Sequence, residues 1–90
     1  MSKVIYRTTL YNKHYIQRIE SNPALKKRFI ERVNLFLKTP NNPVLRNHAL
    51  KGNKKEQKSF SVTGDYRIIY EEFKDYYLFL DVGTHSQVYG

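Results

Sequence analysis

The hydrophobic residues of this ninety-residue chain change their spacing once, from a helical period in the first half to a strand period in the second. A helix over residues 23–38 is predicted by apolar side chains that recur at intervals of four, four and three: Leu25, Phe29, Val33 and Phe36. Asn22 can cap this helix, Pro23 fits its first turn, and Pro40 stops it. The single change of period predicts a fold that contains both helices and strands.

The flanking segments complete an α+β order. Residues 10–21 carry a second helical face, formed by Tyr11, Tyr15 and Ile19, and the short break before Pro23 predicts a helical hairpin. Residues 3–9 favour a first strand. Three further strands joined by tight turns are predicted at residues 59–63, 66–71 and 76–82. We therefore expect one α+β domain over residues 1–90: an N-terminal strand, a two-helix hairpin and a three- to four-stranded antiparallel sheet, with the helices on one face.

The charge of the chain is strongly basic and unevenly distributed. The net charge is +8, and residues 1–64 hold fourteen of the sixteen basic side chains but three of the eight acidic ones. A basic surface with a sequence pI near 9.8 favours a polyanion such as nucleic acid, or an acidic protein partner. The alternative is a solvated surface that keeps a small protein soluble.

Several classes of protein are excluded by what the sequence lacks. The absence of cysteine excludes disulfides and thiolate metal sites. No apolar run approaches the roughly 20 residues of a membrane helix, and residues 1–4 lack the apolar core of a signal peptide. No histidine has a partner at metal-ligand spacing. We expect a soluble cytoplasmic protein with no metal, no cofactor and no membrane partner.

Two histidines stand where loops are predicted. His48 lies in the long basic connection of residues 41–58, and His85 follows the last strand in a segment, residues 83–90, that is expected to be a loop without a further helix. The third, His14, is interpreted as a solvated residue on a helix face.

Asp65 and Arg67 flank the predicted turn at Gly64. Strand alternation places Arg67 opposite Ile68 and Tyr70, on the face of the sheet that the helices leave open. Basic side chains of the long connection could join it there.

These residue types suit the cleavage of RNA. RNA supplies its own nucleophile, the 2′-hydroxyl, so the protein needs a base, an acid and a cation near the charged phosphorane. Histidine moves protons near neutral pH, and arginine binds phosphate. Tyr89 could stack on a base or hold a phosphate oxygen.

Nearly the whole chain resembles the RelE/ParE superfamily of toxin–antitoxin toxins, and most of all its YafQ-type branch. The resemblance rests on residues 60–70 (FSVTGDYRIIY), residues 80–85 (LDVGTH), Val88-Tyr89, and a loop at residues 48–52 that matches the branch's His-x-Leu-x-Gly pattern. It implies a compact ribonuclease fold with two helices on a twisted antiparallel sheet. It further implies cleavage of mRNA during translation, commonly on the ribosome, and neutralisation by a cognate acidic antitoxin in a hetero-oligomeric complex.

The resemblance also assigns roles to residues. It implies phosphate stabilisation by Arg67 and proton transfer by His85 as general acid or base, with Asp65 or His48 in the complementary role. Ser61 stands where the branch has a further histidine. The side chains expected to bind the substrate are Tyr89, Arg46, Lys51, Lys54 and Lys55.

Two other functions remain open on the same fold. A ParE-like gyrase inhibitor would perform no chemistry of its own, and the presence of His48, Asp65 and His85 argues against it. A basic RNA-binding domain would bind RNA in a salt-sensitive way without cleaving it.

Overall fold

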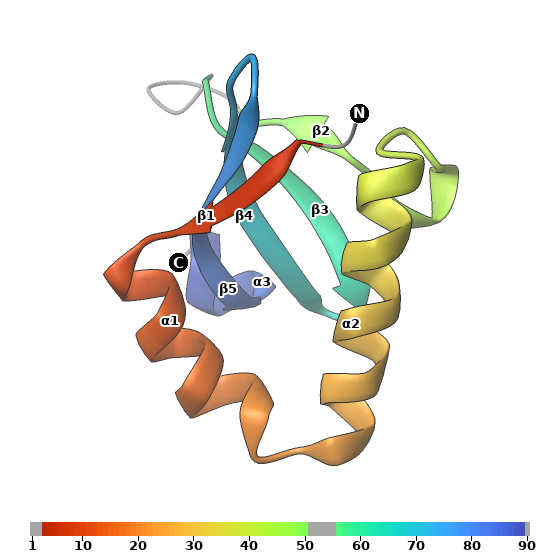
Figure 1. Cartoon of the computed structure of the whole chain (residues 1–90). Coiled ribbons are helices and arrows are strands. Elements are labelled where there is room, and N and C mark those ends of the chain that lie inside the picture. Colours follow the sequence, from red (N-terminus) through yellow and green to blue (C-terminus); the bar gives the residue numbers. More distant parts are fainter. Residues whose placement is uncertain (1–2, 51–55, 90) are drawn as a thin grey trace.

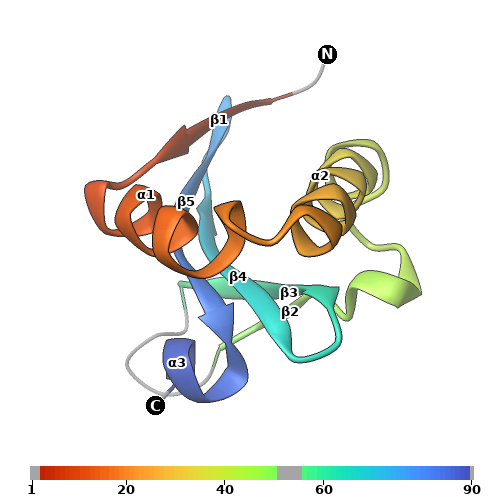
Figure 2. The ribbon, with the colours of Figure 1, turned by 90° about the horizontal axis from the view of Figure 1, so that it is seen from below.

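The computed structural model describes residues 3–50 and 56–89. Its elements follow in the order β1 (Val4–Arg7), α1 (Thr9–Tyr15), a π-helical turn (Ile16–Glu20), α2 (Pro23–Lys38), a 3₁₀ turn (Pro43–Leu45), β2 (His48–Ala49), β3 (Lys58–Thr63), β4 (Tyr66–Glu72), β5 (Tyr76–Thr84) and α3 (His85–Tyr89). The strands form one sheet in the order β1-β5-β4-β3-β2. Helices α1 and α2 lie on one side of it and α3 on the other (Figures 1 and 2). The predicted α+β class is confirmed.

Both long helices begin where side chains can cap them. The Thr8 hydroxyl accepts a hydrogen bond from the Tyr11 amide at 3.0 Å, and Asn22 Oδ1 accepts one from the Leu25 amide at 3.1 Å. The predicted bounds of α2 are confirmed, with Pro23 in its first turn. The earlier helix differs from the prediction, because α1 ends at Tyr15 and continues as the π-helical turn.

The sheet is mixed, and the expected purely antiparallel pairing is wrong for β1. β3, β4 and β5 form the predicted meander, but β1 pairs with β5 in parallel, with Val4 opposite Tyr76. The two helices carry the chain back across one face, so that β3 starts in the same direction as β1. β5 lies two antiparallel steps from β3 and is therefore also parallel to β1.

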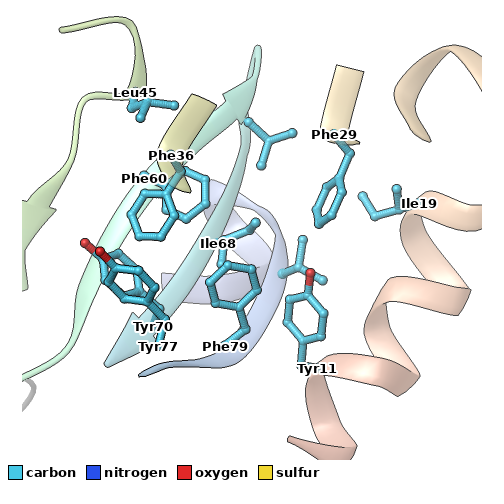
Figure 3. Packing of buried hydrophobic residues seen from close by; sticks show 12 residues of the cluster. Tyr11, Ile19, Phe29, Phe36, Leu45, Phe60, Ile68, Tyr70, Tyr77 and Phe79 are labelled. Atoms are coloured by element: carbon cyan, nitrogen blue, oxygen red, sulfur yellow. The ribbon is translucent and has the colours of Figure 1, made fainter. Parts of the chain in front are cut away.

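The core is an aromatic layer between α2 and the sheet (Figure 3). Phe36 is fully buried, and its ring stacks on Phe60 at a centroid distance of 4.2 Å. The rings of Tyr70 and Tyr77 meet Phe36 at 4.9 and 4.7 Å. Leu45 is also fully buried, which attaches the connection after α2 to this core. The connection was expected to be a loop throughout, but it contains the short strand β2, paired with β3.

None of the helices in the described part of the chain combines the length and the apolar character needed to cross a membrane.

Candidate active site

The segment after the last strand forms the short helix α3, and the expectation of a loop there is wrong. Thr84 and Gln87 make a reciprocal capping box, in which the Thr84 amide donates to Gln87 Oε1 at 2.8 Å and the Gln87 amide donates to Thr84 Oγ1 at 3.4 Å. The His85 amide donates to the carbonyl oxygen of Asp65 at 3.0 Å. These bonds attach α3 to the β3–β4 turn and fix the position of His85.

Gly83 allows the close approach on which α3 depends. A Cβ at this position would lie 2.6 Å from Arg18 Nη1 and 2.7 Å from Gln87 Oε1, closer than side chains tolerate. The Arg18 guanidinium instead donates to the Val82 carbonyl at 2.8 Å. A Cβ here would therefore displace the ends of the Arg18 and Gln87 side chains, which bond to the backbone where α3 leaves the sheet.

Arg67 is the centre of the hydrogen-bond network on the open face. Its Nε donates to Ser59 Oγ at 2.7 Å and to Tyr89 Oη at 3.0 Å, and the Tyr89 hydroxyl donates to Ser59 Oγ at 2.6 Å. Its Nη2 donates to the Arg46 carbonyl at 3.2 Å. Among the residues that the structure describes, Nη1 has no hydrogen-bond partner, which leaves a donor for a ligand.

The His48 loop is attached to the core through Asn47. The Tyr70 hydroxyl donates to Asn47 Oδ1 at 2.8 Å, and Asn47 Nδ2 donates to the Pro40 carbonyl at 3.0 Å. Burial raises the pKa of Tyr70 to about 12, against a smaller lowering by the hydrogen bond to Asn47. Tyr70 therefore remains a neutral donor throughout the neutral pH range.

The same loop favours one tautomer of His48. Its Nδ1 lies 2.9 Å from the Arg46 carbonyl, which can only accept, and 3.4 Å from Arg67 Nη2, which can only donate; the shorter contact favours the proton on Nδ1. The nitrogen that remains free to accept a proton in the neutral ring is Nε2. Arg46 itself has a φ of +48°, in the left-handed region that residues other than glycine rarely adopt.

These segments surround a hollow of about 510 Å³. It is lined by Arg46, His48, Ala49, Leu50, Arg67, His85 and Tyr89. The rings of His85 and Tyr89 meet edge to face at a centroid distance of 4.5 Å. Two imidazoles, two guanidinium groups and one phenol thus share one open cavity on the sheet.

The structure brings together five of the residues predicted from the sequence: Arg46, His48, Arg67, His85 and Tyr89. It does not bring in the carboxylate of Asp65, which is exposed and does not line the hollow. Asp65 contributes its backbone carbonyl instead, as the acceptor for the His85 amide. Lys51, Lys54 and Lys55 lie outside the described residues.

Ser59 was missed by the sequence interpretation. It is fully buried and accepts hydrogen bonds from both Arg67 and Tyr89. Alternation along β3 places Ser59 on the face opposite Phe60, which is the face of Arg67, so the sequence could have predicted the face on which Ser59 lies. Which residue of β4 lies beside Ser59 depends on the strand register, and alternation does not predict the register.

The expectation that His14 is solvated is also wrong. Its Nδ1 lies 2.5 Å from Asp81 Oδ1 in a partly buried pair, and Arg18 Nη1 lies 3.7 Å from the same oxygen. This pair joins α1 to β5, away from the hollow. Within residues 3–50 and 56–89, no group of three or more His, Cys, Asp or Glu side chains is arranged to hold a metal ion.

Comparison with known proteins gives one family. A family model described as the bacterial toxin of type II toxin–antitoxin systems, YafQ, matches residues 3–90. No curated protein matches the sequence at a significant level.

Several solved toxin structures share the fold. A chain of the E. coli DinJ-YafQ toxin–antitoxin complex aligns with a TM-score of 0.73 at 22% identity, covering 100% of both chains. A metal-bound toxin from Helicobacter pylori aligns with a TM-score of 0.74 at 21% identity, covering 98% of this chain and 99% of that one. A YoeB/ParE toxin from Agrobacterium tumefaciens aligns with a TM-score of 0.74 at 14% identity, covering 91% and 98%.

Proposed function

Because the chain belongs to the YafQ family of toxins of bacterial type II toxin–antitoxin systems, we propose that it is an endoribonuclease that cleaves mRNA in the cytoplasm, on the translating ribosome. The observation that carries the proposal is the single hollow that holds His48, Arg67 and His85. Together these side chains supply the base, the cation and the acid that cleavage by the 2′-hydroxyl requires. A cognate antitoxin, acidic to match the basic surface, is the proposed protein partner; the relative from E. coli was solved in such a complex.

The reaction divides between the two histidines. His48 Nε2 accepts the proton of the 2′-hydroxyl, and the 2′-oxygen attacks the adjacent phosphorus. The free Nη1 of Arg67 donates to the phosphorane oxygens as negative charge develops. His85 donates a proton to the departing 5′-oxygen, which leaves a 2′,3′-cyclic phosphate and a 5′-hydroxyl. The tautomer of His48 supports its role as the base, and the exposed carboxylate of Asp65, outside the hollow, is the weaker alternative.

Primer extension on mRNA after induced expression tests the activity. The wild-type protein is expected to produce discrete cleavage ends and arrest growth, and His85→Ala to produce neither. His14→Ala is the matched control, because it removes a histidine that lies outside the hollow. Thermal unfolding of each variant shows that the fold is retained. A folded His85→Ala protein that still cuts mRNA would refute the role of His85.

The acid and the base can be told apart with an mRNA that carries a 5′-bridging sulfur at the cleaved bond. A thiolate leaves without protonation, so this substrate no longer needs the general acid. His85→Ala is expected to recover activity on it, whereas His48→Ala stays inactive. The reverse pattern would exchange the two roles.

The gyrase alternative predicts different products. If the chain acted as a ParE-like inhibitor, expression would block DNA supercoiling and leave mRNA intact. Supercoiling and primer-extension assays on the same preparation separate the two functions.

A further inference from the structure

A second hollow adjoins the first and has no part in the chemistry above. It has a volume of about 450 Å³ and is lined by Arg32, Pro43, Val44, Arg46, Ser61, Thr63 and Gly64. Arg46 lines both hollows. Arg32 comes from α2, and the hydroxyl residues come from β3.

The lining of the second hollow suits an anion. Two arginines and two hydroxyl-bearing residues line it, and no acidic residue of the described part of the chain does. Arg28, one turn earlier on α2, pairs with Glu31 at 3.8 Å, whereas in the described part of the chain no carboxylate lies within ion-pair distance of Arg32 or Arg46. The two arginines therefore keep their charge available for a ligand.

The backbone of the β3–β4 turn is uncovered at Gly64, which lines the hollow. Gly64 has a φ of +51°, and a Cβ placed there would meet no heavy atom within 4 Å. A ligand can thus approach the backbone of the turn directly. Ser61, a small residue, is among those that line the hollow.

The backbone of Arg46 is held in the conformation that places it between the hollows. A left-handed conformation in a residue other than glycine costs about 1 kcal/mol or more and persists only where its surroundings enforce it. The Arg46 amide donates to the Pro43 carbonyl at 3.2 Å, and its own carbonyl accepts from His48 and Arg67. The network of the first hollow therefore fixes the residue that also lines the second.

We propose that the second hollow binds a neighbouring phosphate of the same RNA strand that is cut in the first. The inference rests on the proposed function and adds a substrate-binding site formed by Arg32, Arg46, Ser61 and Thr63. Ser61, which lines the second hollow, is the register partner of Arg67, which lines the first, so a strand with its scissile phosphate at Arg67 presents its next phosphate close to the second hollow. Planar guanidinium groups with hydroxyls beside them match the oxygens of a phosphodiester, and they bind it whatever the base. The site therefore raises affinity and positions the strand without reading its sequence.

The test measures binding to RNA that cannot be cut, because every 2′-hydroxyl is methylated. Fluorescence anisotropy with a short labelled strand is expected to show about tenfold weaker binding for Arg32→Ala, the effect of losing one charge-assisted contact. The slope of log affinity against log salt concentration should fall by about 0.7, the value for one phosphate on a single strand. Arg28→Ala is the matched control and should bind like the wild type.

A length series identifies the phosphate concerned. The wild type is expected to bind a methylated trinucleotide, with two phosphates, about tenfold more tightly than a dinucleotide with one. Arg32→Ala should lose most of that gain, and Arg32→Lys should recover part of it. Equal affinities of Arg32→Ala and Arg28→Ala, or a full gain from the second phosphate in Arg32→Ala, would overturn the proposed site.

The outcome also separates this site from the cleavage function. If the wild type cuts mRNA but the two arginine variants bind alike, the cleavage proposal stands and the second site is rejected. If the wild type neither cuts nor binds RNA, both are rejected. Weakening by Arg32→Ala of antitoxin binding alone, with RNA binding intact, would assign the hollow to the protein partner and reject the RNA site.

Discussion

At the scale of single residues, the candidate site depends on Arg67 and the groups that hold it. Residue type and motif selected Arg67, His48 and His85 as candidates, because each carries chemistry that few residues supply, and the structure places all three around one hollow. Residue type and motif were not enough for Ser59 or Asp65. Ser59 matters through the strand register that places it 2.7 Å from Arg67, and Asp65 matters through a backbone carbonyl that any residue would provide.

Tyr89→Phe tests the hydroxyl that joins Arg67 to Ser59. The variant keeps the ring against His85 but loses the acceptor for Arg67 Nε and the donor to Ser59. Cleavage in a translating extract is expected to slow about tenfold, and the free energy of unfolding to fall by about 1 kcal/mol, the usual net value of such bonds. Tyr6→Phe, an exposed tyrosine of β1, should change neither quantity. Wild-type cleavage by Tyr89→Phe would show that Arg67 needs no support from this hydroxyl.

At the scale of elements, α3 shows how a short helix is made stable by its surroundings. Five residues are far too few for an isolated helix. It is held in place by the Thr84–Gln87 capping box and by the hydrogen bond from the His85 amide to Asp65. Gly83, which has no side chain, leaves room for Gln87 beside the strand. The segment is too short for hydrophobic periodicity to reveal a helix, although the Thr-x-x-Gln spacing was present as a capping signal.

Gln87→Ala tests whether the capping box positions His85. The variant leaves the Thr84 amide without its acceptor, so α3 is expected to fray at a cost of about 1 kcal/mol. Cleavage should fall at least tenfold, and hydrogen exchange at the His85 amide should accelerate. Gln87→Glu retains an acceptor and should restore both readouts, while Ser86→Ala serves as the neighbouring control. An unchanged exchange rate of the His85 amide in Gln87→Ala would show that the capping box does not position His85.

The end of β4 is joined to two neighbouring segments through Glu72, which predicts a dependence of stability on pH. The ammonium groups of Lys3 and Lys58 bond to its carboxylate at 2.7 and 3.0 Å and lower the pKa of Glu72 below its ordinary value. Because the folded pKa lies below the unfolded value of about 4.3, the stabilisation is complete above that pH. It is lost as the pH falls through the folded pKa.

Urea unfolding of the wild type and Glu72→Gln between pH 2.5 and 7 measures this contribution. Surface ion pairs contribute about 0.2–1 kcal/mol, so the wild type should be more stable by that amount at neutral pH. The two stability curves should converge in acid. A constant difference at every pH would exclude ionisation of Glu72 as the cause.

At the scale of the whole molecule, the order of elements was predictable and the way they close was not. Periodicity and turn residues predicted the helical hairpin and the meander within a few residues, but neither β2 nor α3. The parallel pairing of β1 with β5 depends on the path of the chain across the sheet, which local spacing does not encode. The two faces of the sheet have different roles: the aromatic core lies on the face covered by α1 and α2, and the candidate site lies beside α3. Figure 2 shows these helices on opposite sides of the sheet.

Phe36→Ala tests how far the fold depends on the aromatic core. Phe36 is fully buried against Phe60, Tyr70 and Tyr77, and its truncation is expected to cost about 3–5 kcal/mol. That is a large part of the stability of a small protein, so the variant should be largely unfolded in mild denaturant. Ile30→Ala, which removes an exposed residue of the same helix, should change the free energy of unfolding by less than about 1 kcal/mol. A Phe36→Ala protein as stable as Ile30→Ala would contradict this description of the core.

The pairing of Val4 with Tyr76 has a consequence for how the protein is made. Synthesis proceeds at about 5–20 residues per second, so β1 leaves the ribosome several seconds before its partner strand exists. During that interval the nascent chain can form the helical hairpin but cannot close the sheet. His85 and Tyr89 follow β5, so the candidate site is assembled only after this closure becomes available. A nascent chain that stops short of residue 76 would therefore lack both the closed sheet and the candidate site.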